Sequence, residues 1–142
     1  MNILYIGADA AGSTSQHRAD ALRRLGHQVL HLNPRKPLRN WKLVPPLSVR
    51  CGFKIFAPLI DHYLKGEIKN LSFDVAWLDT GAEIGPRFHR FLARRGMKII
   101  NYNADDPFGN RDGRKWDLYR KSVPYHDITA VVRVENIEEA KA

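Results

Sequence analysis

The residues best suited to chemistry lie in the loop of residues 7–16, directly after the first apolar segment. Ser13 and Gln16 have capping-box spacing, in which the serine accepts a hydrogen bond from the start of a helix. The free N–H groups of a helix start and the helix dipole favour a bound phosphate or carboxylate. A plain strand-to-helix turn is the alternative interpretation. The candidate ligand-binding residues of this loop are Gly7, Asp9, Gly12, Ser13 and Thr14.

The loop lacks the features of two common nucleotide-binding motifs. A phosphate-binding loop of the G-x-x-x-x-G-K-[ST] type would have lysine where this chain has Ser13. The dinucleotide motif G-x-G-x-x-G fails at Asp9, and Asn33 stands where an acid is expected after the second strand. We therefore expect neither nucleotide hydrolysis nor a dinucleotide or other cofactor.

Arg18 lies one turn inside the helix that begins after this loop. A guanidinium group binds a carboxylate or a phosphate with two parallel hydrogen bonds. We expect Arg18 to point into the cleft and pair with an anion there, the alternative being a solvated surface arginine.

Further polar residues follow two later apolar segments. Asp79 and Gly81 follow the segment 74–79, and Asn103, Asp105 and Asp106 follow the segment 97–102. Because the carboxyl ends of parallel strands meet at one edge of a sheet, these residues are predicted to share a cleft with the first loop. Neighbouring carboxylates in an extended segment point in different directions, so we expect at most one of Asp105 and Asp106 to face it. A turn before Pro107 is the alternative role for this pair.

Apolar segments alternate with helical patterns along the chain. Strands are predicted at 2–7, 28–32, 74–79, 97–102 and 128–132, and helices at 14–25, 47–70, 86–95, 115–122 and from 135. The prolines between 34 and 46 are expected to prevent regular structure there, and the second helix is expected to break or restart at Pro58. Its apolar face is predicted to comprise Phe53, Phe56, Ile60 and Leu64. This order predicts one α/β domain over 1–142, a Rossmann-like three-layer sandwich with a mostly parallel sheet of about five strands.

Composition narrows the class of protein. The chain has 142 residues, no long apolar run and no secretory leader pattern, so we expect a cytoplasmic protein, with a peripheral position at a membrane surface as the open alternative. A single cysteine, Cys51, allows no internal disulfide. The six histidines show no metal-ligand spacing, and no metal site is predicted.

The net charge of +8 is concentrated in one segment. Residues 35–69 contain two acids and the basic residues Arg35, Lys36, Arg39, Lys42, Arg50, Lys54, Lys65 and Lys69. With Trp41, Leu43 and Val44 nearby, this basic insertion is predicted to meet an anionic membrane or an acidic acceptor. A solvated insertion whose apolar residues pack on the sheet is an equal alternative. No nucleic-acid-binding motif is present, so nucleic acid is not an expected partner.

Several blocks of the sequence carry a family resemblance. They are Asn2-Ile-Leu-Tyr-Ile-Gly, the run from Gly12-Ser-Thr-Ser through Arg18 to Leu25-Gly26-His27, the segment Phe73-Asp74-Val75 to Gly81, and Asn101-Tyr102 with Asp105-Asp106-Pro107-Phe108. In this order they resemble the N-terminal domain of GT-B glycosyltransferases, especially the CgeB-like spore-maturation group, and more broadly glycosyltransferase family 4. The resemblance implies two Rossmann-like domains that face a cleft, the first binding acceptor and the second binding a nucleotide-sugar donor.

The chain ends at Ala142, where that family would continue into the donor domain. We therefore expect the acceptor-side, N-terminal domain of a nucleotide-sugar-dependent glycosyltransferase, inactive without its C-terminal domain and present as a fragment. The acceptor and the catalytic residues are not specified by the sequence. The alternative is a non-catalytic Rossmann-like module that binds a ligand or a protein.

Overall fold

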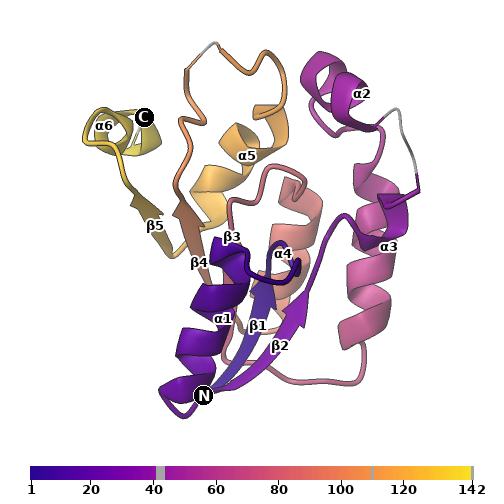
Figure 1. The fold of residues 1–142 in the computed structure, drawn as a ribbon, viewed down its shortest axis with the longest axis vertical. Helices are drawn as coiled ribbons and strands as arrows, with labels where there is room; N and C mark the ends of the chain where they lie inside the picture. The colour runs from indigo at the N-terminus through magenta and orange to yellow at the C-terminus, as the bar shows by residue number, and fades with distance from the viewer. Residues whose placement is uncertain (41–43, 110, 142) are drawn as a thin grey trace.

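The computed structural model describes residues 1–40, 44–109 and 111–141 (Figure 1). Five parallel strands form one sheet in the order β2-β1-β3-β4-β5. The strands are β1 (Asn2–Ile6), β2 (Gln28–Leu32), β3 (Val75–Asp79), β4 (Lys98–Asn103) and β5 (Ile128–Val131). The predicted α/β Rossmann-like fold is confirmed, and each strand lies within one residue of its predicted bounds.

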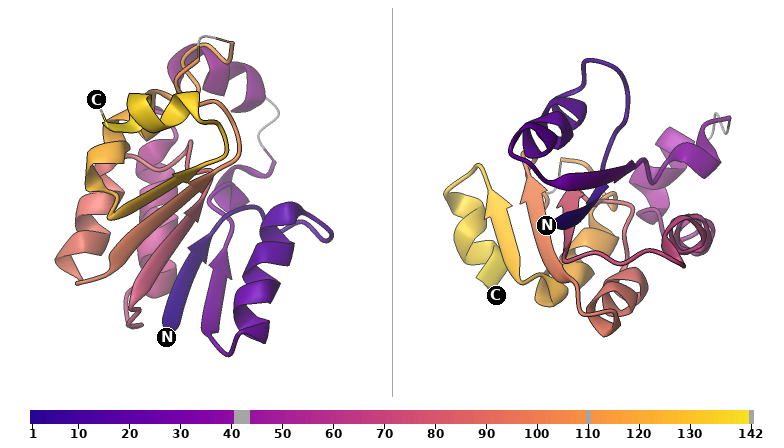
Figure 2. Two further views of the ribbon diagram at one scale, coloured as in Figure 1. Left: turned by 90° about the vertical axis from the view of Figure 1, so that its left-hand side faces the viewer. Right: turned by 90° about the horizontal axis from the view of Figure 1, so that it is seen from below.

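Helices connect the strands and form the outer layers. They are α1 (Thr14–Arg24), α2 (Val44–Cys51), α3 (Ala57–Ile68), α4 (Pro86–Arg94), α5 (Asp117–Ser122) and α6 (Glu135–Lys141), with short 3₁₀ turns η1 (Lys36–Leu38) and η2 (Val123–Tyr125). Figure 2 shows α1 on one face of the sheet and α3, α4 and α5 on the other. In the described part of the chain, no helix combines the length and the apolar character needed to cross a membrane.

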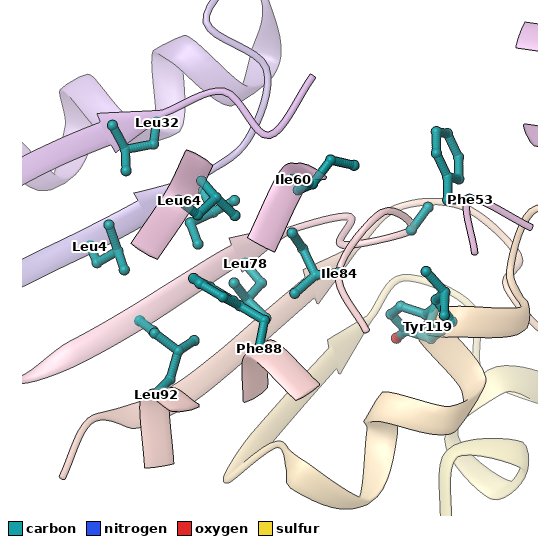
Figure 3. Packing of buried hydrophobic residues seen from close by; sticks show 14 of the residues in the cluster. Leu4, Leu32, Phe53, Ile60, Leu64, Leu78, Ile84, Phe88, Leu92 and Tyr119 are labelled. Carbon is teal, nitrogen blue, oxygen red and sulfur yellow. The ribbon is translucent and has the colours of Figure 1, made fainter. Parts of the chain in front are cut away.

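The main core lies between the sheet and the layer of α3 and α4 (Figure 3). Alternate strand residues such as Leu4 and Leu78 point toward this layer and are fully buried. Helix residues spaced three or four apart, including Ile60, Leu64 and Phe88, meet them and are equally buried. This packing follows from the two periodicities, since every second strand residue and one helix face point toward the core.

The predicted start of the second helix was wrong, whereas the predicted restart at Pro58 is found. An α-helix already begins at Val44, with Pro45 and Pro46 in its first turn, where a missing N–H forfeits no intrahelical bond. The first part, α2, ends before Gly52 and Phe53, whose φ angles are +63° and +58°. The second part restarts as α3 at Ala57, with Pro58 in its first turn. A Cβ on Gly52 would lie 2.1 Å from the Arg114 carbonyl oxygen, so close backbone packing also requires glycine there.

The predicted apolar face of this region is confirmed. Phe53, Phe56, Ile60 and Leu64 are all buried in the core, despite the break between the two helices. Trp41, Lys42 and Leu43, to which the sequence assigned a surface role, lie outside the described residues.

Candidate functional site

A polar crevice of about 240 Å³ opens at the carboxyl edge of the sheet. Strand order reverses between β1 and β3, because the chain leaves β1 toward β2 on one side and returns to β3 on the other. This is the position at which open α/β sheets bind ligands. The lining residues are Gly7, Ala8, Asn33, Pro34, Arg35, Asp79, Thr80, Glu83, Asp105 and Lys115.

Asp79, at the end of β3, is the most heavily bonded carboxylate of the crevice. Arg18 of α1 donates to both of its oxygens, with Nη2 at 2.9 Å from Oδ1 and 2.8 Å from Oδ2. The Tyr5 hydroxyl donates to Oδ2 at 2.7 Å. Burial, reinforced by the bond to Asp79, raises the pKa of Tyr5 to about 12, so the phenol keeps its proton.

Arg18 therefore pairs with an anion of its own chain. The guanidinium also lies over the Tyr102 ring, 4.6 Å from its centroid, which fixes the side chain from a second direction. The sequence predicted both Arg18 and Asp79 as site residues without predicting that they bind each other. Their pair leaves the helix start without a free arginine to attract a phosphate.

The structure confirms one of the two hydrogen bonds of the capping box predicted at the start of α1. Ser13 is the N-cap, and its hydroxyl accepts from the Gln16 amide at 3.1 Å. The reciprocal half of the capping box does not form, because the Gln16 side chain bonds Asp20 while the Ser13 amide donates to the Ala10 carbonyl. Gly12, Ser13 and Thr14 thus shape the turn and the helix start, and they are not among the residues that line the crevice.

Gly7 is required by close packing at the bottom of the crevice. A Cβ at this position would lie 2.4 Å from the Ser15 hydroxyl oxygen and 2.9 Å from the Asp79 Cβ. The missing side chain allows α1 to approach the end of β3, which brings Arg18 within reach of Asp79.

Asp9 lies outside the crevice lining, on the loop above it. Its carboxylate accepts from the Asn33 side chain at 2.6 Å and thereby ties this loop to the end of β2. The residue therefore supports one wall of the crevice.

The loop after β3 contains an unusual backbone conformation. Thr80 has a φ angle of +72° and Gly81 one of +79°, and a positive φ is costly for a β-branched residue such as threonine. The buried Asn101 side chain donates to the Thr80 carbonyl at 3.2 Å and holds the turn. Tyr119 in turn donates to Asn101 at 3.0 Å. Gly81, which the sequence predicted as a site residue, thus forms the turn, and its neighbour Thr80 lines the crevice.

The two acids after β4 point in different directions, as the sequence predicted. Asp105 lines the crevice, and the Asn103 side chain, fully buried below, accepts from the Asp105 amide at 3.0 Å. Asp106 turns toward α6, where its carboxylate accepts from the Asn136 side chain at 3.1 Å and from the Gly109 amide at 3.0 Å. These bonds, chiefly that from Asn136, hold the pKa of Asp106 below its usual value. Asp106 is therefore a structural anchor.

The sequence did not single out the ion pair between Arg35 and Glu83. Arg35, after β2, donates to the nearly buried Glu83 carboxylate, and its guanidinium lies 5.3 Å from the centroid of the Phe53 ring. The sequence feature that could have indicated this pair is a basic residue after β2 and an acidic residue after β3, since the carboxyl ends of both strands lie at the same edge of the sheet. Chain separation hid it, because the two residues are 48 positions apart.

Much of the charge in the basic insertion is used inside the molecule. Besides Arg35, Lys54 bonds Asp117 at 2.9 Å, and this contact above all lowers the pKa of Asp117 to about 2. Arg39 lies 3.8 Å from Asp9. Phe53 and Phe56 are buried and present no apolar surface. Contact of this segment with a membrane stays a prediction, with fewer free cations to support it.

Comparisons with known proteins add no further information. No family model matches the chain, and neither a curated protein nor a solved structure matches it. Among the described residues, no three His, Cys, Asp or Glu side chains gather closely enough to hold a metal ion.

Proposed function

We propose that this chain is the acceptor-side domain of a nucleotide-sugar-dependent glycosyltransferase and that the crevice takes a hydroxyl-rich acceptor. The observation that carries the proposal is the state of Asp105. It is the one carboxylate lining the crevice that has no side-chain hydrogen bond or ion pair to any other described residue. A free carboxylate accepts hydrogen bonds from hydroxyl groups, which is the chemistry that a sugar offers.

The charge balance of the crevice supports an acceptor over a donor. Asp79 and Glu83 are neutralised by Arg18 and Arg35, so neither arginine is free for a ligand. Lys115 lies over the Trp116 ring, 4.4 Å from its centroid, and 3.8 Å from Asp112. A nucleotide diphosphate needs concentrated positive charge, and transfer needs that charge at the leaving group. Under this proposal, the donor and the charge that binds it come from a second domain.

The resemblance in the first loop and in the Asp105-Asp106-Pro107-Phe108 block also supports this function. The second candidate function is a non-catalytic module that binds a ligand or a protein. One observation favours it, namely that Arg18 is fixed by Asp79 and so the first loop has a structural role that needs no ligand.

Binding measurements with an Asp105→Asn variant test the proposal. We expect isothermal titration calorimetry against a panel of mono- and disaccharides to find a sugar that binds the wild type. The Asp105→Asn variant should bind this sugar about tenfold more weakly, because a charge-assisted hydrogen bond becomes a neutral one. Glu67→Gln is the control, since Glu67 is an exposed carboxylate on α3 without an ion pair to another described residue. Equal affinity of the Asp105→Asn variant and the wild type would exclude the proposed role of Asp105.

A further inference from the structure

Four cationic side chains line a groove between α3 and α4, which lie side by side on one face of the sheet (Figures 1 and 2). Lys65 comes from α3, and Arg87, Arg90 and Arg94 come from α4, with Phe91 between them. The groove has a volume of about 420 Å³ and shares no lining residue with the crevice. It contains three cations that lie outside the basic insertion, so the charge pattern of the sequence did not reveal it.

These four cations have no carboxylate partner among the residues that the structure describes. The acid that interacts electrostatically with Lys65 and Arg87 is Asp61, which is buried in α3. Burial raises the pKa of Asp61. One buried acid against four cations leaves the groove strongly positive.

The arginine arrangement is unfavourable for α4 by itself. Arg87 and Arg90 are three residues apart and Arg90 and Arg94 four, spacings at which like charges on a helix repel. Arg87 also lies in the first turn, which contains no acid and where the helix dipole disfavours a cation. Unfavourable local charge that no ion pair among the described residues offsets is typical of a functional site.

Aromatic and backbone contacts give the groove a defined shape. The Lys65 ammonium lies 5.1 Å from the centroid of the half-buried Phe91 ring. Arg95 lies near the same ring, at 5.5 Å, and donates to the Ile68 carbonyl at 3.0 Å. The second contact ties the end of α4 to the end of α3, which fixes the spacing of the two helices.

We propose that the α3–α4 groove binds a soluble ligand that carries two or more phosphate groups. Arginine binds phosphate oxygens through two parallel N–H donors, and three arginines with one lysine match the charge of a linked pair of phosphates. This site is independent of the function proposed for the crevice. Its ligand is recognised by phosphate charge, whereas the crevice ligand is recognised by hydroxyl groups.

Calorimetric titration with pyrophosphate and tripolyphosphate tests the site, with an Arg90→Gln variant and Arg24→Gln as the matched control. Arg24 is exposed on α1, on the opposite face of the sheet, and the control removes the same charge. We expect binding that weakens with ionic strength and that falls about tenfold in Arg90→Gln but not in Arg24→Gln. Amide chemical shifts should move at Lys65 and over residues 87–94. The thermal midpoint of ligand-free Arg90→Gln should equal or exceed that of the wild type, because like-charge repulsion is relieved.

Four results would overturn this proposal. The first is equal affinity loss in the two variants, and the second is a set of shifts confined to the crevice loops. The third is binding of the phosphates by neither variant nor wild type. The fourth is binding only to phosphatidic acid vesicles, which would assign the groove to a membrane surface.

Discussion

Arg18 and Asp79 form a bidentate ion pair that joins the first turns of α1 to the end of β3. The Asp79 side chain is 3% exposed, whereas the Arg18 side chain is 31% exposed, so the arginine can reach water and the carboxylate cannot. Because of this asymmetry in exposure, removing the arginine and removing the carboxylate should lower the free energy of unfolding by different amounts.

Arg18→Met should destabilise the protein by about 1–3 kcal/mol, because it leaves the Asp79 carboxylate buried with the Tyr5 hydroxyl as its only side-chain donor among the described residues. Asp79→Asn should cost less, because the freed guanidinium can turn to solvent. Urea unfolding monitored by circular dichroism measures both, with Arg24→Met on the same helix as the control. A larger loss in Asp79→Asn than in Arg18→Met would contradict the asymmetry.

Gly7→Ala should destabilise the fold by about 1–3 kcal/mol, since the new methyl group meets Ser15 and Asp79 at less than contact distance. Gly66→Ala is the matched control. Gly66 lies inside α3, and apart from its own helix backbone and chain neighbours no described atom lies within 4 Å of the added Cβ, so alanine there should stabilise by about 0.4–1 kcal/mol. The free energies of unfolding of the two variants should therefore change in opposite directions, and equal changes would contradict the tight approach at Gly7.

A pair of histidines, the buried His89 and the half-buried His126, should make stability depend on pH. The His126 Nε2 and His89 Nε2 atoms are 3.1 Å apart, and His89 Nδ1 donates to the Gly85 carbonyl at 2.9 Å. His126 Nδ1 lies 3.0 Å from the Thr129 hydroxyl. A consistent pattern has Thr129 donating to His126, His126 to His89 and His89 to Gly85, with both imidazoles neutral.

Burial lowers the pKa of His89 to about 4 and that of His126 to about 3, the latter with a smaller contribution from His89. Because the unfolded chain takes up these protons near pH 6.5, the stabilisation is complete above that pH and is lost as the pH falls toward 4. Each histidine contributes up to about 1.4 kcal/mol per pH unit in this window. Unfolding free energies measured between pH 7.5 and 4.5 should show a shallower slope in His126→Gln than in the wild type. An unchanged slope would mean that the pair does not titrate as described.

The isolated chain of 142 residues should not transfer sugar from any nucleotide sugar. The physical reason is that Arg18 and Arg35 are held by carboxylates, so the crevice has little free positive charge for a leaving diphosphate. A radiometric transfer assay with a range of donors and acceptors checks this expectation. Measurable transfer would show that the chain binds and activates a donor by itself.

The sequence predicted the strands and the capped turn well because these depend on local patterns, such as the apolar run before Gly7 and the Ser13 cap. The start of α2 was missed because proline is disfavoured inside helices but accepted in their first turn, and sequence alone does not show which applies at Pro46. The Arg18–Asp79 pair was missed because it joins residues 61 positions apart, and only the register of β1 with β3 brings them together. The α3–α4 groove was missed because three of its cations lie on α4, outside the basic insertion, and the fourth joins them from α3.

The most direct test of the proposed acceptor site is an amide NMR titration of the whole chain with mono- and disaccharides. If the crevice takes a hydroxyl-rich acceptor, chemical-shift changes should concentrate at residues 7–8, 33–35, 79–83 and 105. The affinity obtained from these changes should fall about tenfold in Asp105→Asn. Shifts confined to other surfaces, or no shifts with any sugar at concentrations that saturate weak sites, would contradict an acceptor site in the crevice.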